Sequence, residues 1–239
     1  MSPDLSPEAL ATALPGREVR CYPALLSTEA DALAWGRAGA PAGSVVVTDY
    51  QVSPRGRAGL EWTVVPGRSL GFSLIVRPEL PAEREGWLYT VASSGLADHI
   101  GEDAVIEWPD DVFLCDERVA SVGVNAELGP GRVRWAVLNV LVRRVAGARD
   151  LALASTVERI ERRLEAAPDG VLEDYLPRCR TIGRRVTARM IPLGPAGPQV
   201  TGSAAGALMD GALSIATEEG RRVAVRPQSL GILEVSHGG

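Results

Sequence analysis

The sequence contains no lysine, and all 25 basic residues among its 239 are arginines. This absence excludes a Walker A phosphate loop, a Schiff-base lysine and any mechanism that uses a lysine as an acid or electrostatic clamp. Histidine and cysteine are also scarce, with two and three residues whose spacing matches no zinc motif. We therefore predict no metal-ligating residues, and free thiols as in a reducing cytosol.

Long apolar runs are missing as well. No stretch of 18 apolar residues occurs, so no membrane span is expected, and the first residues lack the basic and apolar segments of a secretion signal. The net charge of −5, with dispersed arginines, argues against a nucleic-acid partner. An apolar fraction of 46% nevertheless supports a packed core, and we expect a folded cytoplasmic protein.

What the sequence does contain is a series of short apolar strands with intervening helices. Sequence patterns predict helices at 6–14, from Ser27 through at least Trp35, at 85–99 and across 150–178, with one helix starting at Ser155-Thr156 and ending at Pro168. Strands are predicted at 44–48, 61–65, 70–76, 104–108, 112–114, 119–127 and 132–144. This order indicates an α+β fold, with a mixed or antiparallel sheet and helices on one face.

The character of the chain changes at residue 183. Five short strands separated by tight glycine turns are predicted at 184–190, 199–202, 211–215, 221–225 and 232–235. Such a series is typical of a small β-barrel. We therefore expect two domains, residues 1–182 and 183–239.

The stretch 51–60, QVSPRGRAGL, has no periodicity and is predicted to be a loop. Arg55 and Arg57 could hold a phosphate or a carboxylate by paired hydrogen bonds, and Gly56 and Gly59 would keep the segment pliable. The alternative is that both arginines are solvated loop charges.

Several motifs follow one another in an order that resembles the biotin protein ligase family, within the biotin/lipoate ligases, over most of the chain. Ser27-Thr28 is similar to the start of S-T-N, and Gln51, Arg55, Gly56, Arg57, Gly59 and Trp62 to Q-x-x-G-R-G-R-x-G-x-x-W. Glu107-Trp108-Pro109-Asp110-Asp111 resembles K-W-P-N-D, and Arg118 to Ser121 resembles K-x-x-G. Residues 183–186, 201–202 and 211–213 resemble the SH3-like domain of the family.

The resemblance implies a class II synthetase-like mixed sheet followed by an SH3-like barrel, without a DNA-binding domain. It also implies an adenylate-forming ligase that uses ATP, Mg²⁺ and biotin, and transfers the acyl group to a lysine of a carrier-protein domain. Arg55 and Arg57 would clamp the anions, Trp62 would stack on adenine, and Ser27, Thr28 and Gln51 would bind a polar head group such as a ureido ring. Asp111 would help with Mg²⁺ or orient the amine.

Five departures from the family pattern fall on ligand-site positions. Glu107 replaces the motif lysine, Asp110 the asparagine, Pro54 the first loop glycine and Glu29 the asparagine of S-T-N, while residues 138–142 replace G-x-G-x-N. If Glu107 stood beside the ligand anions, the charge reversal would cost several kcal/mol, since two unit charges at 4 Å interact by about 4 kcal/mol at a dielectric of 20.

Three hypotheses about function therefore stay open. The first is a biotin-type ligase, impaired or retuned, and the second is an enzyme that acts on another substrate with Glu107 or Asp110 as acid or base. The third is a non-catalytic pseudo-ligase that binds a ligand or a partner protein. Structural roles compete at each site, because Trp62 and Trp108 could be core residues, Ser27 a helix cap and Asp110-Asp111 a solvated turn. The sequence also leaves a homodimer open.

Overall fold

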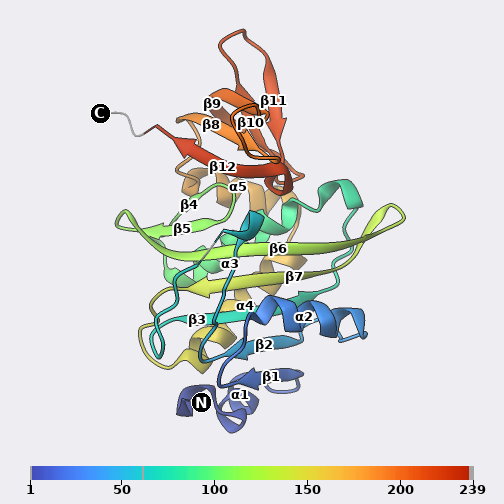
Figure 1. Ribbon diagram of the computed structural model, residues 1–239, viewed down its shortest axis with the longest axis vertical. Coiled ribbons are helices and arrows are strands. Elements are labelled where there is room, and N and C mark those ends of the chain that lie inside the picture. Colours follow the sequence, from blue (N-terminus) through green and yellow to red (C-terminus); the bar gives the residue numbers. More distant parts are fainter. Residues whose placement is uncertain (1, 61, 237–239) are drawn as a thin grey trace.

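A computed structural model describes residues 2–60 and 62–236 (Figure 1). The larger of its two sheets has seven strands in the order β1-β2-β3-β7-β6-β5-β4. β1 pairs with β2 in parallel, and every other pair in this sheet is antiparallel. The strands are β1 Val19–Tyr22, β2 Val45–Thr48, β3 Leu70–Val76, β4 Val105–Glu107, β5 Asp111–Leu114, β6 Glu117–Gly129 and β7 Arg132–Val142. The mixed sheet expected from the sequence is confirmed.

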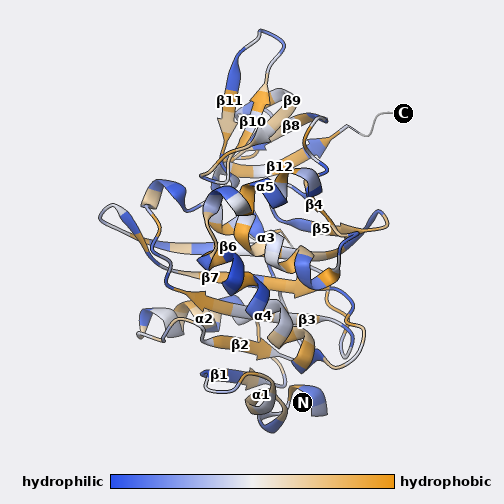
Figure 2. Cartoon of the chain, turned by 180° about the vertical axis from the view of Figure 1, so that it is seen from behind, coloured by the Kyte–Doolittle hydropathy of each residue, from blue (hydrophilic) through white to orange (hydrophobic). Residues whose placement is uncertain are grey.

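Helices cover both faces of this sheet. α2 (Thr28–Arg37) packs on β2, β3 and β7, whereas α3 (Trp87–Ile100) and α4 (Arg149–Glu165) lie on the opposite face (Figures 1 and 2). α1 (Pro7–Ala13) packs on α4, and α5 (Pro168–Arg178) contacts α3. Since both faces are covered, every residue of β3 is buried, which explains its unbroken apolar sequence LGFSLIV.

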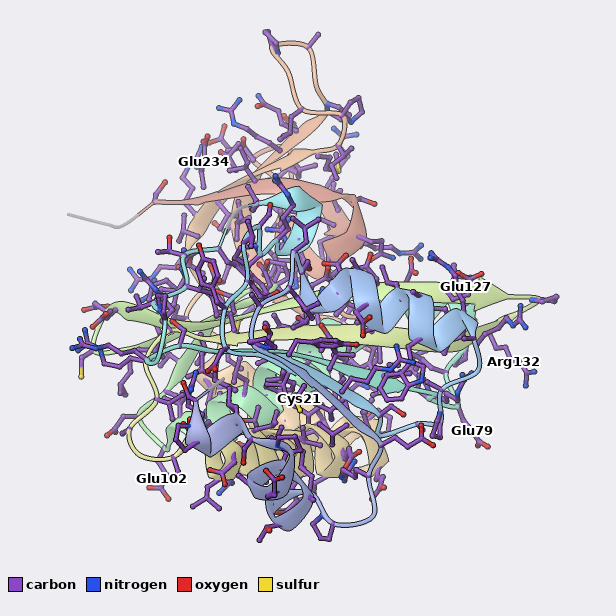
Figure 3. All side chains as sticks on the ribbon, turned by 60° about the horizontal axis from the view of Figure 1, so that its bottom comes forward. Cys21, Glu79, Glu102, Glu127, Arg132 and Glu234 are labelled. Atoms are coloured by element: carbon purple, nitrogen blue, oxygen red, sulfur yellow. The ribbon has the colours of Figure 1, made fainter. Side chains whose placement is uncertain are left out.

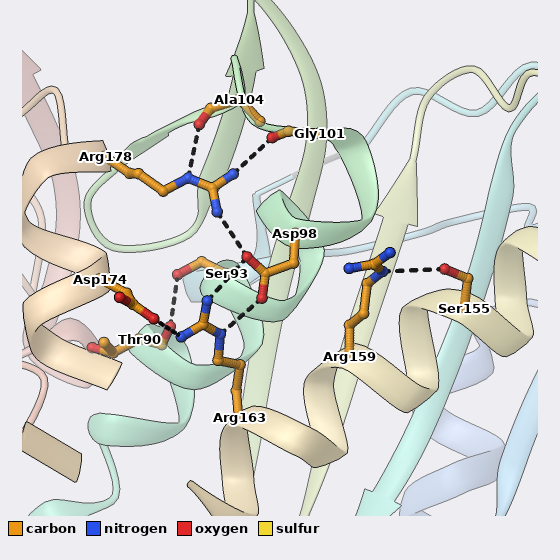
Figure 4. A network of polar contacts seen from close by, with 10 residues as sticks. All are labelled: Thr90, Ser93, Asp98, Gly101, Ala104, Ser155, Arg159, Arg163, Asp174 and Arg178. Atoms are coloured by element: carbon orange, nitrogen blue, oxygen red, sulfur yellow. Dashed lines mark hydrogen bonds and ion pairs between the residues drawn. The ribbon is translucent and has the colours of Figure 1, made fainter. Parts of the chain in front are cut away.

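Polar side chains of α4, α3 and α5 join these three helices on their shared side (Figure 4). Asp98 of α3 accepts hydrogen bonds from Arg163 of α4 at 2.8 and 3.1 Å and from Arg178 of α5 at 2.8 Å. Arg163 also pairs with Asp174 at 2.5 Å. This network fixes α5, which leads the chain towards the second sheet.

The second sheet has five antiparallel strands in the order β11-β10-β9-β8-β12 and is of the SH3-like kind. Its strands are β8 Arg185–Met190, β9 Gln199–Ala207, β10 Leu213–Ala216, β11 Arg222–Val225 and β12 Leu230–Val235. Buried apolar residues of both sheets belong to one continuous core. The division of the chain into domains 1–182 and 183–239 therefore stays a prediction.

Four sequence predictions about elements were inaccurate. Residues 62–65 form no strand, because they belong to the loop that folds back on Pro54. β1 was not predicted, because its four residues are only half-buried and include a polar Arg20. α4 begins at Arg149 rather than at Ser155-Thr156, and Pro168 starts α5 instead of ending α4, since proline suits the first turn of a helix. Helices also cover both faces of the sheet, not one.

Charged side chains gather at the ends of the strands. Figure 3 shows Glu127 and Arg132 at the β6–β7 hairpin, which projects beyond the neighbouring strands. No helix among the described residues is long and apolar enough to cross a membrane.

Candidate functional site

The loop between β2 and β3 folds back on itself. The Gly56 N–H donates to the Leu60 carbonyl at 2.8 Å, and the Trp62 N–H donates to the Pro54 carbonyl at 3.1 Å. Arg57–Gly59 forms a single 3₁₀ turn, η2. A methyl group at position 56 would lie 2.3 Å from Nε1 of Trp62. The indole therefore rests directly on the loop backbone, which only glycine permits.

Arg57 is buried and fully engaged within the protein. Its Nε donates to Asp110 Oδ2 at 3.1 Å, and its Nη1 donates to the carbonyls of Leu230 and Gly231 at 2.5 and 3.1 Å. These contacts join the loop to the β4–β5 turn and to β12 of the second sheet. Arg57 thus sets the position of the loop.

Arg55 is exposed and bends back over the same turn. Its Nη1 donates to the Gly59 carbonyl at 3.0 Å. The loop therefore presents one accessible guanidinium and one that is structural, a division that its sequence does not reveal.

The N-terminus of α2 places polar groups beside this loop. The Ser27 hydroxyl caps the helix by accepting from the Glu29 N–H at 3.2 Å. Thr28 is buried, and its N–H and hydroxyl both donate to Gln51 Oε1, at 3.0 and 3.2 Å. Ser73 Oγ of β3 lies 2.9 Å from Thr28 Oγ1. Thr28 and Gln51 are thus bonded to each other, and neither lines the cavity described below, whereas Ser27 acts as a helix cap.

Glu29 extends from α2 towards the sheet. Its two carboxylate oxygens accept hydrogen bonds from Asn125 Nδ2 of β6 at 2.8 Å and from Asn139 Nδ2 of β7 at 2.6 Å. Burial raises the pKa of Glu29, and the two amide hydrogen bonds partly oppose that rise.

These elements enclose a cavity of about 340 Å³ between α2, the loop, β6 and the second sheet. This volume is at the lower end of the range of small-molecule sites. Both arginines, both glycines of the loop and the Glu29 carboxylate line it. The full lining is Glu29, Arg55, Gly56, Arg57, Ala58, Gly59, Tyr89, Gly123, Val124, Asn125, Ile191 and Gln228.

Asp110 is buried behind Arg57 rather than lining this cavity. Burial raises the pKa of Asp110 to about 7, although the neighbouring Arg57 guanidinium favours the charged form. Burial also raises the pKa of Tyr89, which lies at the start of α3 and lines the cavity.

The other residues of the K-W-P-N-D-like segment lie elsewhere. Glu107 accepts from Arg180 at 2.8 Å, and Asp111 accepts from Ser121 at 2.5 Å and pairs with Arg118 at 3.3 Å. Trp108 is buried where the two sheets meet, and its Nε1 donates to the Gly211 carbonyl at 2.9 Å. None of these three residues lines the cavity.

The negative charge of Glu107 is compensated within the protein. Arg180, whose guanidinium also lies 3.5 Å over the centre of the Phe113 ring, neutralises it. Glu107 therefore places no carboxylate in the candidate site.

The sequence did not single out Tyr89, Gly123, Asn125, Ile191 or Gln228 as site residues. Tyr89 comes from α3, and Ile191 and Gln228 come from segments that connect strands of the second sheet, far from the loop in sequence. Gly123 and Asn125 are two positions apart on β6, so both lie on the same face of the sheet. This spacing is the sequence signal that could have indicated these two residues.

A larger cavity of about 550 Å³ lies between the end of β3 and helices α3 and α4. It contains none of the residues that the sequence singled out. Two of its charged groups are engaged internally, since Arg77 donates to the Ala40 carbonyl and Glu161 pairs with Arg17. The smaller cavity is therefore the better candidate.

The two sheets, their order along the chain and the loop beside α2 define the biotin protein ligase fold. A solved biotin protein ligase of Aquifex aeolicus, in complex with biotin and ATP, shares this fold with a TM-score of 0.69 at 21% identity, over 92% of this chain and 99% of that one.

The chain is also related in sequence to biotin ligases. It is 28% identical to the biotin–[acetyl-CoA-carboxylase] ligase of Mycobacterium tuberculosis over 207 residues, which cover 74% of this chain and 75% of that one. It is 27% identical to the bifunctional ligase/repressor BirA of Bacillus subtilis over 135 residues, which cover 55% of this chain and 42% of that one. The match thus spans less than half of BirA. No family model matches the chain.

Proposed function

We propose that the chain is an ATP-dependent ligase that activates biotin, or a similar carboxylic acid, as an acyl-adenylate and transfers it to a lysine of a carrier-protein domain. The observation that carries this proposal is the cavity between the Arg55–Gly59 loop and the N-terminus of α2, in the fold of the biotin protein ligases. Two anions must meet in this reaction, and a cationic loop that excludes water favours their approach.

The described side chains divide the work between two ends of the site. Glu29 and Asn125, which line the cavity, would face the head group of the acid, and the buried Thr28–Gln51 pair would hold the start of α2 in place. Arg55 would bind the carboxylate or the α-phosphate at the loop end. Trp62 offers an aromatic face for adenine beside Gly56, and Arg57 acts as a positioning residue for the loop.

Mg²⁺ would shield the phosphates of ATP in this chemistry. No group of three or more potential metal ligands occurs among the described residues, and Asp110 and Asp111 are both paired with arginines. The residues present do not form a dedicated magnesium site, so the carboxylates of this segment are assigned no role in metal binding.

The test is a labelling assay with biotin, ATP and a biotin carrier domain, together with titration calorimetry. Wild-type protein should bind biotin and label the carrier. Arg55→Ala should lower kcat/KM by roughly 10- to 100-fold, the range for one charged hydrogen bond. Arg68→Ala, an exposed arginine of the same loop outside the cavity, is the matched control and should have no effect. Absence of both binding and labelling in wild type would refute the proposal.

A second candidate is a non-catalytic protein that binds the same ligand. Two observations favour it. The Arg57 guanidinium is hydrogen-bonded within the protein, and the sequence has no lysine that could bind the ligand anions in its place. Biotin binding without carrier labelling would identify this function. The acid–base alternative gains no support, because neither Glu107 nor Asp110 lines the cavity.

A further inference from the structure

Glu29 is a carboxylate at the head-group end of the cavity. It follows Thr28 directly in the first turn of α2 and lines the cavity together with Asn125. Its hydrogen-bond donors are the side-chain amides of Asn125 and Asn139, at 2.8 and 2.6 Å. Within residues 2–60 and 62–236, no arginine forms an ion pair with Glu29. The carboxylate is therefore solvated by neutral dipoles alone.

A half-buried anion without an arginine partner is an unfavourable arrangement. Burial removes water from the charge, and amide groups and the partial positive charge of a helix N-terminus replace that hydration only in part. A ligand that brings a positive charge or strong N–H donors to this position would complete the compensation.

The cavity is polar in a definite direction. Glu29 of α2 lines one wall, and Arg55 of the loop lines another. Arg57 also lines the cavity, where its guanidinium is bonded to Asp110 and to two backbone carbonyls. A ligand that fits this charge distribution carries an anion at its acyl end and a cation at its head.

We propose that Glu29 is a specificity-determining residue, which makes the site prefer a carboxylic acid with a cationic head group, such as a cyclic guanidinium, over one with a neutral urea. This inference rests on the proposed function, because it uses the same cavity and the same orientation of the acid. It specifies the substrate class as carboxylic acids whose head group is an amidinium-like cation rather than a neutral urea.

Two probes that differ only at the head group test this preference. Biotin has a neutral urea ring, and 2-iminobiotin has a guanidinium ring that is protonated at neutral pH. Titration calorimetry near neutral pH would measure both dissociation constants for wild type, for the isosteric Glu29→Gln variant and for Glu79→Gln. Glu79 is exposed on the rim of the larger cavity and serves as the matched control.

Wild type and Glu79→Gln should bind 2-iminobiotin roughly tenfold or more tightly than biotin, since a charge-assisted hydrogen bond is about twice as strong as a neutral one. Glu29→Gln should abolish or reverse this ratio. If wild type binds biotin as tightly as 2-iminobiotin, or more tightly, the inference is overturned and the proposed function stands. The same holds if the ratio of the two dissociation constants is unchanged in Glu29→Gln. If wild type binds neither probe, with or without ATP, both proposals fail. Should Glu29→Gln not fold, the wild-type ratio alone decides.

Discussion

At the scale of single residues, two carboxylates that look alike in sequence have different environments. Glu107 is half-exposed and paired with Arg180, whereas Asp110 is buried against Arg57. Glu107 ends β4, whereas Asp110 lies in the turn that leads to β5, so the two side chains have different surroundings. The charge reversal that the sequence suggested at Glu107 is therefore balanced away from the cavity.

The buried Asp110 should make stability depend on pH. Its pKa is about 7 in the folded protein and 3.8 in its ordinary state, so its contribution to stability is complete below pH 3.8 and is lost as the pH rises towards 7. Relative to Asp110→Asn, the wild-type free energy of unfolding should fall across this interval by up to about 1.4 kcal/mol per pH unit.

Urea unfolding of both proteins at a series of pH values measures this difference. Asp111→Asn is the matched control, because Asp111 is more exposed and pairs with the exposed Arg118. Parallel pH profiles for wild type and Asp110→Asn would contradict the assigned environment of Asp110.

At the scale of elements, the loop depends on the contact between Gly56 and Trp62. Gly56→Ala would place a methyl group 2.3 Å from the indole nitrogen and displace the ring. We expect weaker binding of ATP, by roughly tenfold, because base–aromatic stacking is worth about 1–3 kcal/mol.

Titration calorimetry with ATP in the presence of biotin checks this expectation. Gly170→Ala in α5, where a methyl group meets no atom within 4 Å, is the control and should bind ATP normally. Unaltered ATP binding in Gly56→Ala would show that Trp62 does not contact the nucleotide.

The three-helix network gives a second prediction at this scale. Asp98→Asn would leave Arg163 and Arg178 without their shared carboxylate, and we expect a loss of about 1–3 kcal/mol, after allowing for partial exposure (Figure 4). Asp174→Asn removes a more exposed partner of Arg163 and should cost well under about 1 kcal/mol. Equal losses for the two variants, measured by urea unfolding, would contradict this assignment.

At the scale of the whole molecule, the two sheets are packed as one body. Trp108 donates to the Gly211 carbonyl, and Arg57 donates to the carbonyls of Leu230 and Gly231. The cavity includes Ile191 and Gln228 of the C-terminal region, so the site is complete only when both sheets are in place. A homodimer stays open, as it was from the sequence; β1 and β4 are the edge strands of the larger sheet, and Ile106 of β4 bridges to Cys179.

Gly211, between β9 and β10, packs closely against Gly86 at the start of α3. A methyl group there would lie 2.1 Å from the Gly86 carbonyl oxygen. Gly211 also has a φ of +81°, a conformation that is strained for any residue other than glycine. Gly211→Ala should therefore destabilise the protein by about 2 kcal/mol more than Gly220→Ala, which has a φ of +77° but no neighbour within 4 Å. Urea unfolding followed by tryptophan fluorescence gives both values, and equal values would show that the junction is not tightly packed.

The sequence by itself determined the order of the elements and the resemblance to the biotin protein ligases. Apolar runs such as 70–76 and glycine turns after residue 183 follow from local periodicity, and the loop arginines and Thr28–Gln51 follow from motif order. Local pattern suffices there because burial and turn geometry act on neighbouring residues.

Only the tertiary structure decided which charges belong to the site. Arg55 and Arg57 are two positions apart in one motif, yet one is exposed and the other is bonded to carbonyls more than 170 residues away. Glu29 meets Asn125 and Asn139 only when α2 packs on the sheet. Charge compensation is a property of distance in space, and folding sets those distances through contacts between residues that are remote in the chain.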